Sequence, residues 1–252
     1  MNVVSDPREY RPADGSHAGR VVLVTGAGDG VGRAVSLALA AQGATVALLG
    51  KTQRKLEAVY DQIVAAGQPT PALLPFNLET ATAVEYDALH GVLDREFGRL
   101  DGLAHIAGIL GSRTPLEHYD VPTWCRVLHV NLTASFILTQ AALPLLKRSA
   151  DASVVFTSSS VGRQGKAYWG AYAVSKFGAE GLMQVLAAEM ADTTNVRSNS
   201  LNPGPVRTYM RLQAYPAEDR SQLREASSIV APYLFLLGPD SRGISGRAFD
   251  CQ

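Results

Sequence analysis

The stretch Val21–Gly32, with the sequence VVLVTGAGDGVG, decides the fold of this 252-residue chain. Its first five residues form a short apolar run, which is typical of a strand buried on both faces of a sheet. A glycine-rich turn follows. Val31, Val35 and Leu39 then recur at helical spacing until Gly43, a typical C-terminal stop. The stretch therefore predicts a strand, a tight turn and a helix in direct succession.

The same unit repeats along the rest of the chain. Further strands are predicted at residues 45–49, 72–76, 100–106, 154–158, 196–201 and 247–251. Helical patterns between them cover residues 53–66, 81–97, 121–147, 172–190 and 227–237. We expect the 121–147 helix to be bent or divided near Pro144. About seven strands alternating with about six helices imply βαβ crossovers. The sequence thus predicts an α/β protein: a Rossmann fold with a doubly wound parallel sheet and helices on both faces.

The domain organisation is simple. No repeat, low-complexity tract or linker divides the chain, so we expect a single Rossmann-fold domain over residues 20–252. Residues 1–19 contain two prolines and two glycines with little periodicity, and we interpret them as an N-terminal surface extension.

Composition and charge exclude several classes of function. Lys plus Arg and Asp plus Glu both total 23, which removes the electrostatic argument for a nucleic-acid or anionic-membrane partner. We find no run approaching the ~18–20 uninterrupted apolar residues of a membrane span. The polar N-terminus lacks the apolar core of a signal peptide. Cys125 and Cys251 have no metal-ligand spacing. We therefore expect a cytoplasmic protein without a metal.

The glycine turn has a spacing of its own. Gly26, Gly30 and Gly32 follow Thr25 in the pattern Gly-x-x-x-Gly-x-Gly, which differs from the commoner G-x-G-x-x-G. Glycines between a strand and a helix let the backbone approach a pyrophosphate at the helix N-terminus, although tight turns use glycine for structural reasons alone. The spacing resembles the opening of the short-chain dehydrogenase/reductase superfamily, in its compact branch of about 250 residues.

Tyr172 and Lys176 form the Tyr-x-x-x-Lys motif of that superfamily. Residues four apart lie on one face of a helix, so Lys176 can hold an ammonium near the Tyr172 phenol. An ordinary phenol has a pKa of about 10, and we expect the cation, helped by an oxidised nicotinamide, to lower it toward neutral pH. By itself, the same string is also compatible with a pair of exposed side chains on a surface helix.

Two further residues match catalytic positions of the resembled family. Ser159 precedes Tyr172 by the family's offset, which implies that its hydroxyl holds the substrate's carbonyl oxygen. Asn131 matches the helix asparagine that holds a water molecule in a proton relay. Residues 158–160 could instead be a polar turn, and residues 131–133 are formally a glycosylation sequon. The resemblance thus predicts Asn131, Ser159, Tyr172 and Lys176 as catalytic residues.

The resemblance extends over residues 20–251. Residues 202–208, NPGPVRT, are similar to the family's Pro-Gly segment, which implies that Val206 faces the nicotinamide carboxamide and Thr208 bonds to it. Pro-Gly is also ordinary turn chemistry. Residues 157–181 further resemble the YciK-like bacterial oxidoreductases.

Two positions depart from the family pattern. His105-Ile106-Ala107-Gly108 stands where relatives carry Asn-Asn-Ala-Gly, so the small pair remains while both asparagines are absent. We interpret His105 as a structural replacement, with membership of a proton relay as the alternative. Asn77 replaces the usual aspartate that contacts adenine, and a neutral amide can still accept that bond.

The second strand indicates which dinucleotide binds. NAD-preferring sites place a carboxylate at its end, whereas this chain has Gly50 followed by Lys51, which suits a 2′-phosphate. Asp29 occupies a position where many NADP-using relatives have arginine, and Lys51 could be only a solvated helix start. We favour NADP(H), with NAD(H) as the alternative. The predicted cofactor-binding residues are Gly26, Gly28, Asp29, Gly30, Val31, Gly32, Lys51, Asn77, Leu78, Ala107, Gly108, Tyr172, Lys176, Pro203, Gly204, Val206 and Thr208.

Three segments, residues 108–116, 162–170 and 209–220, border the expected substrate site. Their apolar content favours a partly hydrophobic carbonyl or alcohol, and residues 209–226 are expected to form a lid. Trp169 could contact substrate, or it could belong to the core or to a subunit contact.

Carbonyl reduction is the leading prediction for the function. An enoyl-type reductase of carbon–carbon double bonds and a catalytically silent dinucleotide sensor are the alternatives. Broad apolar helix surfaces favour a homodimer or homotetramer.

Overall fold

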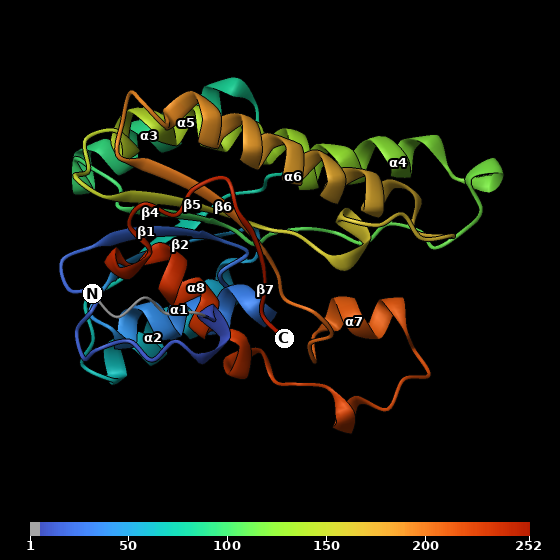
Figure 1. Ribbon diagram of the computed structural model, residues 1–252, viewed down its shortest axis with the longest axis horizontal. Helices are drawn as coiled ribbons and strands as arrows, with labels where there is room; N and C mark the ends of the chain where they lie inside the picture. The colour runs from blue at the N-terminus through green and yellow to red at the C-terminus, as the bar shows by residue number, and fades with distance from the viewer. Residues whose placement is uncertain (1–5) are drawn as a thin grey trace.

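Seven parallel strands form a single sheet in the order β3-β2-β1-β4-β5-β6-β7. The computed structural model describes residues 6–252 (Figure 1). The strands are β1 (Val21–Thr25), β2 (Thr45–Gly50), β3 (Ala72–Pro75), β4 (Gly102–His105), β5 (Ala152–Thr157), β6 (Val196–Asn202) and β7 (Ala248–Asp250). The strand order reverses between β1 and β4, the kind of switch point at which open α/β sheets bind ligands. The predicted doubly wound Rossmann fold is confirmed.

Helices cover both faces of the sheet (Figure 1). They are α1 (Gly30–Ala41), α2 (Gln53–Ala65), α3 (Ala83–Phe97), α4 (Val121–Leu128), α5 (Ala134–Leu146), α6 (Gly170–Met190), α7 (Tyr209–Ala214) and α8 (Ala231–Leu237). Short helical turns are η1 (Pro7–Glu9), η2 (Leu116–His118), η3 (His129–Thr133), η4 (Ser160–Gly162), η5 (Arg220–Gln222), η6 (Ala226–Ile229) and η7 (Pro239–Ser241). Alternate residues of β1 enter different cores: Val22 and Val24 pack with α1, α2 and α8, while Leu23 packs with α3, α5 and α6.

The predicted helix over residues 121–147 is divided at a different place from the one expected. A π-helical turn, η3, separates α4 from α5, whereas Pro144 lies inside the last turn of α5. Single π turns occur frequently at functional sites, and this one carries Asn131. The expected division near Pro144 does not occur, because a proline near a helix end removes only one hydrogen bond and α5 continues past it.

The helix formed by α4, η3 and α5 is also long and apolar enough to cross a membrane, by length and composition alone. Its mean hydropathy is 1.2 over the decisive window, of which 44% is buried. Counting uninterrupted apolar residues did not reveal it. Core helices pass the same test, and here α5 packs against α3 while α4 packs against α6.

The predicted N-terminal extension, residues 1–19, lies partly outside the described residues, which begin at residue 6. Within the described part, two side chains are buried beneath α8. The Tyr10 ring meets Phe235 edge-on at 5.3 Å, and His17 Nε2 lies 3.0 Å from the Leu234 carbonyl oxygen. The segment therefore runs along the surface but is anchored to the core.

Candidate functional site

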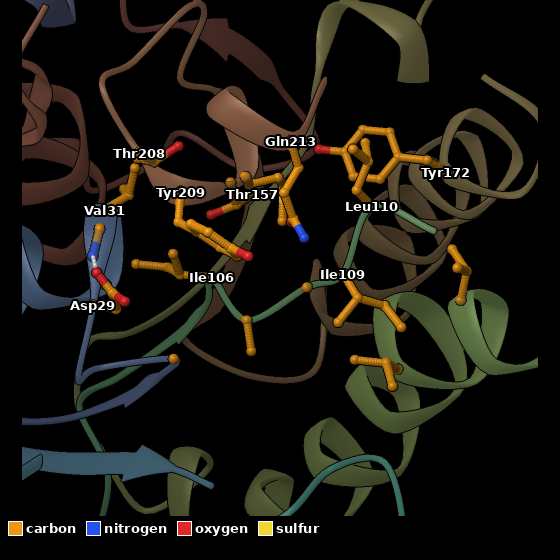
Figure 2. A pocket seen from close by; sticks show the side chains of 18 of the residues that line it. Asp29, Val31, Ile106, Ile109, Leu110, Thr157, Tyr172, Thr208, Tyr209 and Gln213 are labelled. Carbon is orange, nitrogen blue, oxygen red and sulfur yellow. Dashed lines mark hydrogen bonds between the residues drawn. The ribbon is translucent and has the colours of Figure 1, made fainter. Parts of the chain in front are cut away.

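A cavity of about 1100 Å³ opens at the carboxyl ends of the central strands (Figure 2). Its lining brings together all the predicted cofactor-binding residues and three of the four predicted catalytic residues. The lining includes Gly26, Gly28, Asp29, Gly30, Val31, Gly32, Lys51, Asn77, Leu78, Ala107, Gly108, Ser159, Tyr172, Lys176, Pro203, Gly204, Val206 and Thr208. Asn131 is the exception.

The glycine turn forms one wall of this cavity by close backbone contact. A Cβ atom on Gly32 would lie 2.2 Å from the Gly26 carbonyl oxygen, which no side chain allows. Gly26 itself has φ +67°, and a Cβ atom there would lie 3.1 Å from Ala107 Cα. The turn leads directly into α1, whose N-terminus Asp29 caps by accepting a hydrogen bond from Gly30 N at 2.7 Å. This is a cradle for a phosphate group at a helix N-terminus.

Thr25 forms hydrogen bonds with the backbone of residues 104–107, where the two asparagines of the family are absent. Its Oγ1 donates to the Ala104 carbonyl oxygen at 3.2 Å and accepts from Ile106 N at 2.9 Å and Ala107 N at 3.0 Å. One hydroxyl at the end of β1 thus fixes the backbone after β4 beside the glycine turn.

His105 points away from the cavity, toward α5. Its Nε2 lies 2.9 Å from Thr139 Oγ1, and its ring stacks on Phe156 at 4.7 Å. Burial, helped by the Lys176 charge, lowers the pKa of His105 to about 3, so the ring is neutral at physiological pH. This geometry favours the structural interpretation of His105 over a proton relay.

Tyr172 and Lys176 lie one turn apart on α6, and both are buried in the cavity wall. Lys176 Nζ donates to the Thr157 carbonyl oxygen at 2.7 Å and lies 5.6 Å from the centre of the Tyr172 ring. The Tyr172 phenol oxygen points toward the cavity, beside Leu110 and Gln213 (Figure 2). The phenol and the ammonium therefore border the same space as the glycine turn.

The pKa values of this pair differ from the expectation drawn from the cation alone. Burial raises the pKa of Tyr172 to about 12, against a smaller opposing effect of a hydrogen bond with Ser159. Burial also lowers the pKa of Lys176 to about 8, with Glu180 opposing the shift. Burial is the largest effect on both groups in this cofactor-free state, and the expectation that Lys176 and an oxidised nicotinamide together lower the pKa of the phenol stays a prediction.

Asn131 stands behind the cavity rather than in its wall. Its Oδ1 accepts from Ile109 N at 2.8 Å, and its Nδ2 donates to the Ile109 carbonyl oxygen at 2.9 Å and to Ser175 Oγ at 3.0 Å. The side chain thus ties the loop after β4 to α6 between Tyr172 and Lys176. Its role in a water relay stays a prediction.

The part of the cavity beside β2 and α2 carries a cation, Lys55, that was not among the predicted site residues. Lys51 pairs with Glu79 at 3.9 Å, and Arg126 also pairs with Glu79. Lys55 pairs with Asp29 across the glycine turn. Lys55 lies in the first turn of α2, whereas Lys51 precedes the helix, so no spacing in the sequence relates the two lysines.

The substrate end is lined by aromatic and cationic side chains. Trp169 is buried, with its ring 5.8 Å from the Tyr172 ring and 6.0 Å from the Tyr215 ring. It packs within the chain in a cluster that includes Leu110 and Ala214, and it also lines the cavity. Trp169 is therefore both a core residue and a cavity residue.

The expected lid carries a helix, α7, that the sequence patterns did not reveal. Ala214 at its end is buried, and Arg113 from the opposite loop donates to the Ala214 carbonyl oxygen. Tyr209, at its start, extends into the cavity (Figure 2). Arg113 and Gln213 were not predicted as individual site residues. Within residues 6–252, no group of three or more His, Cys, Asp or Glu side chains could hold a metal ion.

Residues 20–219 match the family model described as short chain dehydrogenase. The chain is 45% identical to the uncharacterized oxidoreductase YciK of Escherichia coli K12, over 96% of both chains. It is 30% identical to a cyclohexanol dehydrogenase of an Acinetobacter species, over 91% of this chain and 92% of the relative. It is also similar to a solved structure from Escherichia coli CFT073, assigned as a short chain dehydrogenase and complexed with NADPH. That match has a TM-score of 0.92 and 45% identity, and it covers 96% of this chain and all of the other.

Proposed function

This chain belongs to the short-chain dehydrogenase/reductase family of oxidoreductases, and we propose that it transfers a hydride between NADP(H) and a carbonyl or alcohol substrate. One observation carries the proposal: Tyr172 and Lys176 are buried side by side in the wall of the same cavity that the glycine turn borders.

The cavity fits a dinucleotide. The absent Cβ atoms of Gly26 and Gly32 and the N-terminus of α1 provide a phosphate cradle, and Lys51 and Lys55 lie in the lining beyond it. No carboxylate stands at the end of β2, where the last residue is Gly50 and Lys51 follows. The similar protein complexed with NADPH supports the same choice. When bound, the nicotinamide supplies or accepts the hydride.

The chain's own residues handle the proton. Ser159, at the end of β5, holds the substrate oxygen, and Tyr172 donates its proton to that oxygen during reduction. Lys176 keeps a positive charge beside the phenol while its Nζ is bonded to the Thr157 carbonyl oxygen. The positive charge of an oxidised nicotinamide acts in the same direction on the pKa of Tyr172, which burial otherwise raises.

A panel of aldehydes and ketones with NADPH tests this function. Tyr172→Phe should lower turnover by roughly 10²–10⁴-fold, the usual worth of a positioned acid–base group, while the Kd for NADPH changes little. Tyr60→Phe on α2, outside the cavity lining, is the matched control and should keep full activity. Equal turnover by native protein and Tyr172→Phe would refute the proposal.

The cofactor preference has a separate test. Titration of both reduced cofactors should give the tighter Kd for NADPH, and Lys51→Ala should weaken NADPH binding more than NADH binding. Clearly tighter NADH binding would refute the assignment of NADP(H).

We also propose that the chain forms a homodimer or homotetramer through α5 and α6. These helices expose large apolar side chains, including Phe136, Phe177 and Val185. Sedimentation at working concentration should show an oligomer, and a monomer would contradict this. The cytoplasmic location stays a prediction.

A further inference from the structure

Arg113, in the loop after β4, lines the substrate end of the cavity together with Tyr172 and Trp169. We propose that the substrate is an oxo acid or hydroxy acid whose carboxylate binds Arg113 while its carbonyl or hydroxyl group lies at Tyr172. The inference rests on the proposed function and adds the chemical class of its substrate.

Arg113 differs from the other cationic side chains that line the cavity. Lys51 and Arg126 share Glu79, and Lys55 pairs with Asp29. Arg211 pairs with Glu218, and Lys176 is the buried lysine beside Tyr172. Within residues 6–252, Arg113 forms no ion pair with a carboxylate of the chain. An arginine without an anion at a binding cavity is a site for an anionic ligand group.

Two aromatic rings hold the Arg113 guanidinium in place. Its central carbon lies 4.9 Å from the centre of the Trp169 ring and 4.7 Å from that of the Tyr215 ring. One N–H group donates to the Ala214 carbonyl oxygen, and a guanidinium has five. The remaining N–H groups are available at the edge of a fixed planar group, which is the geometry that binds a carboxylate.

Trp169 connects this cation to the reacting end of the cavity. Its ring centre lies 5.8 Å from the Tyr172 ring centre and 4.9 Å from the Arg113 guanidinium carbon. The Tyr172 ring and the Arg113 guanidinium can therefore be no farther apart than the sum of these two distances. A small molecule can therefore reach both groups. Leu110, Trp169 and Met210 contribute apolar lining to the same cavity, which suits a hydrocarbon spacer between carbonyl and carboxylate.

A matched pair of ketones tests the inference. We would measure kcat/KM with NADPH for 4-oxocyclohexanecarboxylate and for its methyl ester. Native protein should prefer the acid by about tenfold or more, the usual worth of a charge-assisted hydrogen bond. In Arg113→Gln the ratio of acid to ester should fall to about one, and Arg113→Lys should recover part of it. Arg95→Gln on α3, an exposed arginine outside the lining, should leave the native ratio unchanged.

Arg113 also links its loop to α7 through Ala214, so a purely structural role makes a different prediction. If Arg113→Gln lowers kcat/KM equally for acid and ester, Arg113 only holds the lid and the inference is overturned. It is equally overturned if native protein shows no preference for the acid.

A binding measurement separates failure of this inference from failure of the proposed function. Calorimetry with NADP⁺ present should show cyclohexanecarboxylate binding to native protein and about tenfold weaker binding to Arg113→Gln. If no ketone is reduced while this difference remains, the carboxylate site stands and the proposed reaction fails. If ketones are reduced and native protein binds the carboxylate no better than the variant, the reaction stands and the Arg113 inference fails.

Discussion

The two ends of the sheet treat polar groups in opposite ways. At the amino ends, Asp151 before β5 accepts from Arg20 at 3.0 Å and from Arg197 at 2.9 Å, and all three side chains are nearly buried. Arg197 also donates to the Leu236, Gly238 and Ser241 carbonyl oxygens. Asp151 and Arg197 therefore each have several partners inside the protein, whereas Arg20 Nε has no hydrogen-bond partner within the described residues.

At the carboxyl ends some polar groups are buried without a partner. Ser158 Oγ and Trp169 Nε1 have no hydrogen-bond partner within the described residues. Burial raises the pKa of Tyr172 and lowers the pKa of Lys176, so it favours the neutral form of each side chain. The two ends therefore differ in how buried charges are paired: Asp151 and Arg197 neutralise one another at the amino ends, whereas Lys176 at the carboxyl ends is buried without an ion pair within the described residues.

Breaking the network at the amino ends should have the largest effect on stability. Asp151→Ala leaves Arg197 buried without its carboxylate, which should lower the free energy of unfolding by about 3–5 kcal/mol. Chemical denaturation measures the change. Asp94→Ala, which breaks an exposed pair with Arg148, is the control and should cost less than about 1 kcal/mol. Similar losses in both variants would remove the contrast between the ends.

Removing a charge at the carboxyl ends should raise the free energy of unfolding instead of lowering it. Lys176→Met should stabilise the cofactor-free protein at pH 7 by up to about 3 kcal/mol, because the native state holds the buried ammonium against a pKa of about 8. The unfolded chain, with an ordinary lysine pKa of 10.5, binds more protons between these values, so native stability rises with pH through this window. The advantage of the variant should therefore shrink between pH 8 and 10.5. Denaturation of both proteins at pH 7 and pH 10 tests this, and a destabilised variant at pH 7 would contradict it.

The smallest effect is expected at His105, beside the site but outside its cavity. His105→Asn removes the ring that stacks on Phe156 and should cost about 1 kcal/mol at pH 7, with turnover little changed. Since burial lowers the pKa of His105 to about 3, the unfolded chain binds more protons below the ordinary histidine pKa of 6.5. Native stability should therefore fall more steeply with acid than that of the variant. Denaturation at pH 7 and pH 5 measures both slopes, and parallel slopes would place His105 in a solvated environment.

All seven strands were predicted, and apolar runs indicated the central ones, β1, β2, β4 and β5, most clearly because strands buried on both faces are rich in apolar residues. The motifs around Gly26 and Tyr172 located the cavity for a related reason. Close approach of the backbone at a turn and the i,i+4 relation on a helix are local properties, so the spacing of residues in the sequence is enough to predict them.

Properties that depend on packing could not be predicted in the same way. The π turn around Asn131 exists where its side chain bonds the Ile109 backbone and Ser175. Arg113 and Lys55 belong to no motif, and the folded chain brings them to the cavity. The pKa of Tyr172 depends on how completely its phenol is buried, which its neighbours in the sequence do not specify.

An ultraviolet titration of the Tyr172 phenol, taken as the difference between native protein and Tyr172→Phe, tests the central claim most directly. We predict no Tyr172 phenolate up to about pH 10, the ordinary pKa of tyrosine, in the cofactor-free protein. With NADP⁺ bound, the phenolate should appear at a pH lower by about one unit or more. The same titration curve with and without NADP⁺ would contradict the account, since the dinucleotide would then not act on the group proposed to carry the proton.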